Sequence, residues 1–171
     1  MQERPDVDVR LVDLEDAGHQ RAIIELLDAY AREPQVGGIA FSAEVRARLI
    51  SELRKQSAGR YFLAFHEAQA VGVAICFMGF STFYAQPLLN IHDLAVRDGF
   101  RGLGIGRTML MAIEAEAKSQ GCCKVTLEVR ADNPGARRLY EDVGFSAGET
   151  SSSTFAFMTK KLDDSPSQSS E

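Results

Sequence analysis

Residues 100–107 read FRGLGIGR, in which three glycines at alternate positions stand between two arginines. Glycine weakens the interior of a helix or strand, so this density indicates a backbone that a ligand must approach closely. The segment lies between an expected strand and an expected helix. The first amides of a helix lack internal partners, and the helix dipole adds partial positive charge there. With Arg101 and Arg107 as charged donors, the stretch predicts a site for phosphate or pyrophosphate.

Two well-known nucleotide-binding patterns do not fit this loop. The Walker A pattern G-x-x-x-x-G-K-[ST] is absent from the sequence. The dinucleotide fingerprint G-x-G-x-x-G places Arg107 where its third glycine belongs, and Glu128, inside an expected strand, is the sole candidate for its acidic residue. A nicotinamide-binding oxidoreductase is therefore disfavoured. A glycine-rich connection that binds nothing is the other alternative.

A second group of residues, NPGARRLYEDVGF (133–145), has the pattern of a short helix with one functional face. Asn133 suits the N-cap, and the proline after it suits the first turn. Asn133, Ala136, Arg137 and Tyr140 are spaced i, i+3, i+4 and i+7, so they share a face. A ligand along that face could meet the Asn amide and the Tyr hydroxyl together. The alternative for Tyr140 is a core tyrosine with a satisfied hydroxyl.

The hydropathy pattern predicts one α/β domain over residues 1–162, followed by a polar tail over 163–171 that is too poor in apolar residues to pack. The elements expected in order are a strand over 7–12, helices over 16–32 and 42–56, strands over 60–66, 71–84 and 88–96, a helix from the glycine loop to 120, a strand over 124–130, a helix over 133–143 and a strand over 154–162.

Two motifs together resemble the GNAT superfamily of N-acetyltransferases. Arg101, Gly104 and Gly106 match the acetyl-CoA signature [QR]-x-x-G-x-[GA]. The pattern of 133–145, with Asn, Ala, Tyr and Gly-Phe at the family's spacing, is similar to the family's second motif. The resemblance implies an α+β fold, whose mostly antiparallel sheet has a splayed central parallel strand pair and flanking helices. The splayed strands would be 88–96 and 124–130.

In such a fold the cofactor is acetyl-CoA, with its pantetheine arm in the gap between the splayed strands. The resemblance implies that the backbone of Leu94 and Val96 bonds the pantetheine and the acetyl carbonyl. The full set of cofactor-binding residues carried over is Leu94, Ala95, Val96, Arg101, Gly102, Leu103, Gly104, Ile105, Gly106, Arg107, Asn133, Gly135, Ala136 and Tyr140.

Acetyl transfer to an amine requires a base that neutralises the amine and an acid that protonates the leaving thiolate. Tyr140 is the candidate acid, because a phenol titrates slightly above a thiol. His92 is the candidate base, since imidazole titrates near neutrality; its alternative role is a bond to neighbouring backbone. Strand alternation predicts that His92 and Asp93 point to opposite faces, which makes Asp93 structural.

The acceptor site is expected to form from residues 30–38 and 80–84. The candidate substrate-binding residues are Asp28, Tyr30, Ser81, Tyr84 and His92. Asp28 and Glu33 could attract a cationic amine, although Glu33 is better interpreted as part of a solvated helix face. GFSTFY (79–84) could wall a pocket or cap an exposed hairpin.

Bulk properties restrict the function further. The net charge of −5 argues against general nucleic-acid binding. No signal peptide is visible, and the longest apolar run, 71–80, is half the length of a membrane span. Three cysteines without CxxC spacing indicate a reduced, cytoplasmic protein without a structural metal.

We expect an N-acetyltransferase for a small-molecule amine. The alternatives are acetylation of a protein N-terminus or lysine, and a non-catalytic acyl-CoA sensor. The resemblance also implies a homodimer.

Overall fold

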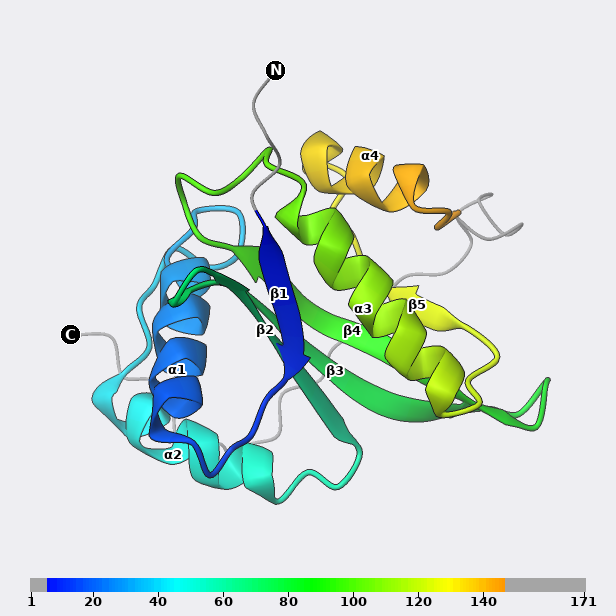
Figure 1. Ribbon diagram of the computed structural model, residues 1–171, viewed down its shortest axis with the longest axis horizontal. Coiled ribbons are helices and arrows are strands. Elements are labelled where there is room, and N and C mark those ends of the chain that lie inside the picture. The colour runs from blue at the N-terminus through cyan, green and yellow to red at the C-terminus, as the bar shows by residue number, and fades with distance from the viewer. Residues whose placement is uncertain (1–5, 147–171) are drawn as a thin grey trace.

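The computed structural model describes residues 6–146, which form a five-stranded sheet with helices on both faces (Figure 1). The strand expected over 154–162, the end of the domain and the polar tail lie outside the described residues. The elements are β1 (Val7–Leu11), α1 (Ala17–Ala31), α2 (Ala43–Arg54), β2 (Gly59–His66), β3 (Gln69–Ser81), β4 (Gln86–Val96), α3 (Ile105–Ser119), β5 (Val125–Leu127) and α4 (Pro134–Asp142).

The strands lie in the order β1-β2-β3-β4-β5, and every neighbouring pair is antiparallel except the parallel pair β4–β5. The mixed, mostly antiparallel sheet expected from the sequence is therefore confirmed. The long connections before β5 pass through α3, as a crossover between parallel strands requires.

Two apolar cores lie on opposite faces of the sheet. On one face α1 and α2 pack through residues such as Ile23, Leu26 and Leu53. On the other, α3 packs through Met109 and Ile113, with α4 beside it. The alternation of β3 serves both cores, because its successive side chains point to opposite faces.

Capping residues decide where three of the four described helices begin. Asp16, Ser42 and Asn133 accept hydrogen bonds from the backbone amides three residues later, at the starts of α1, α2 and α4. The strand expected over 71–84 begins two residues earlier, at Gln69, and ends three residues earlier, at Ser81. Residues 82–85 form the turn into β4. Ala85 has a φ of 50°, which fits a tight turn better than a strand.

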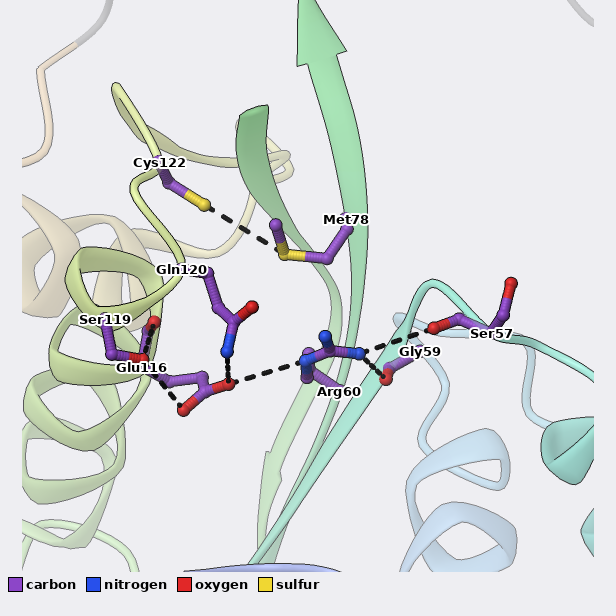
Figure 2. Close-up of polar contacts among 8 residues, drawn as sticks. All are labelled: Ser57, Gly59, Arg60, Met78, Glu116, Ser119, Gln120 and Cys122. Atoms are coloured by element: carbon purple, nitrogen blue, oxygen red, sulfur yellow. Dashed lines mark hydrogen bonds and ion pairs between the residues drawn. The ribbon is translucent and has the colours of Figure 1, made fainter. Parts of the chain in front are cut away.

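A polar cluster fixes the C-terminal end of α3 against the start of β2 (Figure 2). The Arg60 guanidinium lies 3.4 Å from the Glu116 carboxylate and donates to the carbonyl of Gly59 (2.8 Å). Gln120 Nε2 also donates to the Glu116 carboxylate (3.0 Å). Because Arg60 and Glu116 are mostly shielded from water, this contact orients α3 more strongly than an exposed ion pair would. The opposite end of α3 is thereby held beside the glycine loop.

The parallel pair β4–β5 ends early. Its ladder pairs Leu89, Asn90 and Ile91 with Val125, Thr126 and Leu127, whereas β4 continues five residues further to Val96. The prediction of a strand over 124–130 is therefore wrong for its second half, because residues 128–130 are not part of a strand and do not pair with β4. Beyond Ile91, β4 keeps a ladder only with β3, and its other edge faces the opening.

Asp28 lies at the join of α1, α2 and the loop between them. Its buried carboxylate accepts from the backbone amide of Phe41 (2.7 Å) and from Arg32 (2.8 Å), and it also bonds Arg46. Burial alone would raise the pKa of Asp28, but these donors outweigh burial and lower the pKa below its usual range. Asp28 therefore acts in the fold, and its expected role in binding an acceptor is not supported.

We predict that Asp28→Asn destabilises the protein by about 2 kcal/mol, because a charged acceptor of several hydrogen bonds is lost. The folded-state pKa of Asp28 is lowered, so its contribution is present above the unfolded pKa and disappears as the pH falls through the folded pKa. Urea unfolding of both proteins at several pH values measures this. A deficit that stays constant down to the most acidic pH would contradict the assignment.

Candidate active site

A cavity of about 640 Å³ opens at the end of the sheet where β4 and β5 have parted. The β4–α3 loop, the α1–α2 loop, residues 128–130 and α4 surround it (Figure 1). It is lined by Tyr30, Glu33, Gln35, Val36, Leu94, Ala95, Val96, Phe100, Arg101, Gly102, Gly104, Ile105, Gly106, Arg107, Glu128, Val129, Arg130, Asn133, Gly135, Ala136, Leu139, Tyr140 and Asp142.

The glycine loop presents bare backbone to this cavity. Gly102 and Gly104 have φ angles of 77° and 87°, a left-handed conformation that other residues rarely adopt. A Cβ added at either glycine would have no heavy atom within 4 Å, so a ligand can approach both closely.

The start of α3 is the natural position for an anion. Gly104 is its N-cap, and α3 is the one helix within residues 6–146 that no side chain caps. The first hydrogen bond along the helix runs from Thr108 N to Gly104 O (3.1 Å), so the amides of Ile105, Gly106 and Arg107 precede it. These amides and the helix dipole suit a phosphate group.

Gly106 has a different reason to be glycine from the one the loop pattern suggests. A Cβ there would lie 2.9 Å from Cδ2 of Leu139 on α4. The missing side chain therefore leaves room for Leu139 at this contact between the first turn of α3 and α4.

Tyr140 lies on the face of α4 that lines the cavity, together with Asn133 and Ala136. Burial raises the pKa of its phenol, and the nearby Tyr30 raises it further. Its ring packs edge-on against Phe145, with centroids 5.9 Å apart. At neutral pH the phenol is therefore protonated and held in place, as a proton donor must be. Asn133 uses its side-chain oxygen to cap α4, bonding Ala136 N at 3.1 Å.

A bulge in β4 changes the expected orientation of the two titratable side chains. The register passes from Ile75–Asp93 directly to Cys76–Ile91, so His92 is the extra residue. Ile91 packs in the α3 core, while Ala95, of the same parity, packs in the α1 core. The prediction that His92 and Asp93 point to opposite faces is wrong, because the bulge shifts the alternation between them. Both lie on the α1 face, where the His92 ring packs edge-on against Phe77 at 6.0 Å.

Asp93 is a partly buried carboxylate near the acceptor side of the cavity. Burial raises its pKa, and the neighbouring His92 opposes that rise. Its charge, in turn, raises the pKa of Tyr30, whose main perturbation is burial. Among residues 6–146 no hydrogen bond or ion pair to the Asp93 side chain is found, so the structural role expected for it is not supported. A carboxylate kept in such a position is a candidate for function.

Several other predicted site residues lie outside the cavity lining. Leu103, within the glycine loop, does not contribute to it. Ser81 is buried at the end of β3, and Tyr84 is 65% exposed in the hairpin turn, where its ring lies under Lys124. His92 is exposed on the α1 face of the sheet and is not part of the cavity lining. The aromatic segment 79–84 thus caps a hairpin rather than walling the cavity.

Residues that the sequence analysis missed come mainly from two segments. Glu33 was interpreted as solvated, yet its side chain is 18% exposed and turns into the cavity. Residues 128–130 were read as strand, which concealed their place in the lining. Gln35 and Val36 belong to the segment 30–38 that was expected at the acceptor site, whereas Phe100, Leu139 and Asp142 lack a recognisable signal in the sequence.

Cysteine and metal chemistry find no support in the described part of the chain. Burial raises the pKa of the Cys76 thiol to about 12, which keeps it protonated. Within residues 6–146 no three His, Cys, Asp or Glu side chains come together as a metal site. The same residues include no helix that is both long and apolar enough to span a bilayer.

The geometry and the sequence define one class of protein. Residues 22–145, well over half of the chain, match the acetyltransferase (GNAT) family. The chain therefore belongs to that family.

Curated relatives match parts of the chain. The chain is 38% identical over 72 residues to the uncharacterized N-acetyltransferase YycN of Bacillus subtilis, covering 42% of each. It is 41% identical over 87 residues to the N-alpha-acetyltransferase MAK3 of Arabidopsis thaliana, covering 49% of this chain and 43% of that protein. It is 28% identical over 96 residues to the thialysine N-epsilon-acetyltransferase of Caenorhabditis elegans, covering 56% and 59%. The matched region spans less than two thirds of each of these relatives.

Solved structures share the fold. A Vibrio cholerae integron cassette protein has a TM-score of 0.76 at 19% identity, covering 92% of this chain and 93% of that one. An aminoglycoside acetyltransferase from an uncultured soil metagenomic sample, in complex with sisomicin, has a TM-score of 0.74 at 20% identity, covering 91% and 96%. The fold is therefore that of the GNAT acetyltransferases.

We predict that Gly104→Ala weakens coenzyme A binding at least tenfold, because the new Cβ forces the loop out of its left-handed conformation and covers the amides of α3. Gly99→Ala is the matched control. Gly99 has a φ of 84° and open space around it, but it lies outside the cavity lining. Calorimetric titration with coenzyme A measures both; equal losses of affinity would show that only backbone strain matters.

We predict that Asp93→Asn stabilises the protein at pH 7. The folded-state pKa of Asp93 is raised, so ionising it costs stability as the pH rises through the unfolded and then the folded pKa. The gain should disappear on acidification below the unfolded pKa, where both states bind the proton. Thermal unfolding of the two proteins between pH 3 and 7 measures the difference. Destabilisation by Asn at pH 7 would show that Asp93 is a structural acceptor.

Proposed function

We propose that the protein is an acetyl-CoA-dependent N-acetyltransferase that acetylates a primary amine. The observation that carries this proposal is the common cavity. It joins the glycine loop, the free edge of β4 and the Tyr140 phenol in one space. Family membership supports the same reaction class.

The residues present fit acetyl-CoA. The left-handed glycines and the first-turn amides of α3 form a cradle for a pyrophosphate, with Arg101 and Arg107 at its edges. The β4 residues Leu94 to Val96 have an edge that β5 does not pair, which suits an amide-rich arm. A cavity of 640 Å³ is within the usual range for small-molecule sites.

Acetyl-CoA would supply the thioester-bound acetyl group, and the chain would manage the protons. We assign Tyr140 as the general acid, which donates its phenolic proton to the departing sulfur. Its pKa lies above neutrality, so the phenol carries that proton at pH 7. Its position on α4 places it in the cavity lining.

We assign the removal of the amine proton to the pair His92 and Asp93. Both lie on the α1 face of β4, and Asp93 is close enough to Tyr30, a lining residue, to perturb its pKa. Because His92 is outside the lining, the proton would reach it through water. Tyr30 remains the one predicted substrate-binding residue that lines the cavity, and it would position the amine.

The acceptor proposed is a small cationic amine, since an acidic side chain, Glu33, stands at the acceptor end of the cavity. A protein N-terminus is the second candidate. The 41% identity to an N-alpha-acetyltransferase favours that reading, whereas the similarity to a thialysine acetyltransferase favours a small molecule. The expectations of a cytoplasmic location and a homodimer remain predictions.

Free-thiol release from acetyl-CoA tests the function, with separate pools of polyamines, amino acids, aminoglycosides and peptides as acceptors. Release stimulated by one pool identifies the acceptor class. Coenzyme A binding without release from any pool would favour an acyl-CoA sensor. Absence of both would contradict the proposal.

In the productive pool, we predict that Tyr140→Phe lowers kcat by about 10²–10⁴-fold, since a general acid typically contributes that much. Its dissociation constant for coenzyme A should change little, because only the hydroxyl is removed. Tyr84→Phe, in the exposed hairpin turn outside the cavity, is the control and should keep full activity. An unchanged kcat in Tyr140→Phe would remove Tyr140 from the mechanism.

A further inference from the structure

The α1–α2 loop and the β4–α3 loop lie side by side at the open end of the sheet (Figure 1), and one ion pair joins them. Glu33 on the first loop bonds Arg101 on the second. The two residues are 68 positions apart in sequence. Both line the cavity, and since the Glu33 side chain is 18% exposed and the Arg101 side chain 48% exposed, the pair lies at the rim of the cavity.

Each partner is held in place by further bonds. Arg101 Nε donates to the carbonyl of Val96 (3.1 Å), which fixes the guanidinium over the end of β4. Gln35 Nε2 donates to the second carboxylate oxygen of Glu33 at 2.6 Å. The amides of Val36, Gly37 and Gly38 all donate to the Glu33 carbonyl, at 2.9, 3.1 and 3.0 Å. The α1–α2 loop therefore folds around the backbone of Glu33.

The same two residues have separate uses when the site is filled. Arg101 begins the motif that leads into the phosphate cradle, so the pyrophosphate of acetyl-CoA competes with Glu33 for its guanidinium. An amine acceptor arrives as an ammonium ion and needs a carboxylate. Glu33 is near Tyr30, whose raised pKa reflects burial first and then the charges of Asp93 and Glu33.

We propose that the Glu33–Arg101 pair is a latch between the two binding sites and that Glu33 is the residue that recognises the acceptor ammonium. In the absence of acetyl-CoA, the Arg101 guanidinium forms an ion pair with the Glu33 carboxylate. Binding of the pyrophosphate withdraws Arg101, and the carboxylate becomes available to the amine. This inference rests on the proposed function and adds a residue that determines the order of binding and the charge of the acceptor.

The latch predicts that removing the charge of Glu33, a residue of the cavity lining, strengthens coenzyme A binding. Glu33→Gln should tighten coenzyme A binding about two- to fivefold at low ionic strength, because Arg101 loses its better-shielded carboxylate partner and keeps only the exposed Asp98 at 3.4 Å. If Glu33 instead braced the loaded site, the substitution would weaken binding. Glu33→Asp, which keeps the charge but shortens the side chain, should also tighten binding.

Glu25→Gln is the matched control. Glu25 is on α1, and its carboxylate lies 3.8 Å from Arg97, so the variant makes the same change of charge at an ion pair outside the cavity. Calorimetric titration of the four proteins with coenzyme A is the experiment. Tightening in both Glu33 variants but not in Glu25→Gln supports the latch. Unchanged or weaker binding in the Glu33 variants overturns it.

The second part of the proposal is tested with the amine pool that supports thiol release. Glu33→Gln should raise KM for that amine at least tenfold while leaving kcat largely unchanged, because Glu33 binds the acceptor without moving its proton. An unchanged KM would overturn the acceptor role. If the unaltered protein fails to bind coenzyme A at all, the proposed function fails rather than the latch.

Discussion

The constraint on which the structure depends is the end of the β4–β5 ladder at Ile91 and Leu127. Beyond it, β4 has a partner on one edge only, and the polar groups of its other edge need hydrogen bonds from elsewhere. A sheet that remained paired to Val96 would leave no room for the cavity. The parting of two parallel strands thus creates both the space and the backbone groups that a ligand requires.

The helices hold this opening from both sides of the sheet. The contact of Glu116 with Arg60 fixes one end of α3, so its uncapped end stays beside the glycine loop. Gly106 leaves room for Leu139 of α4, the helix whose Tyr140 lines the cavity. On the other face, Asp28 secures the end of α1 and the loop beyond it. Residues remote from the site therefore determine its shape.

The sequence predicted the order and type of every described element, together with the glycine loop and the face of α4. Those signals are local, since caps, glycines and helical spacing act within a few residues. The orientation of Asp93 was mispredicted because a bulge depends on the pairing of β4 with β3, which period-two alternation does not reveal. The buried position of Asp28 and the place of Glu33 in the cavity lining were missed for a similar reason: their partners, Arg46 and Arg101, are distant in sequence.

The bulge also explains why two titratable residues share one face of a strand. A regular strand would bury either His92 or Asp93 in the α3 core, where a charge would find no water. The extra residue places both on the side of α1, with Asp93 close to Tyr30. Holding Asp93 there costs stability, since its pKa is raised by burial. A partly buried carboxylate beside a cavity is typical of functional sites, which supports the proposed part of Asp93 in proton transfer.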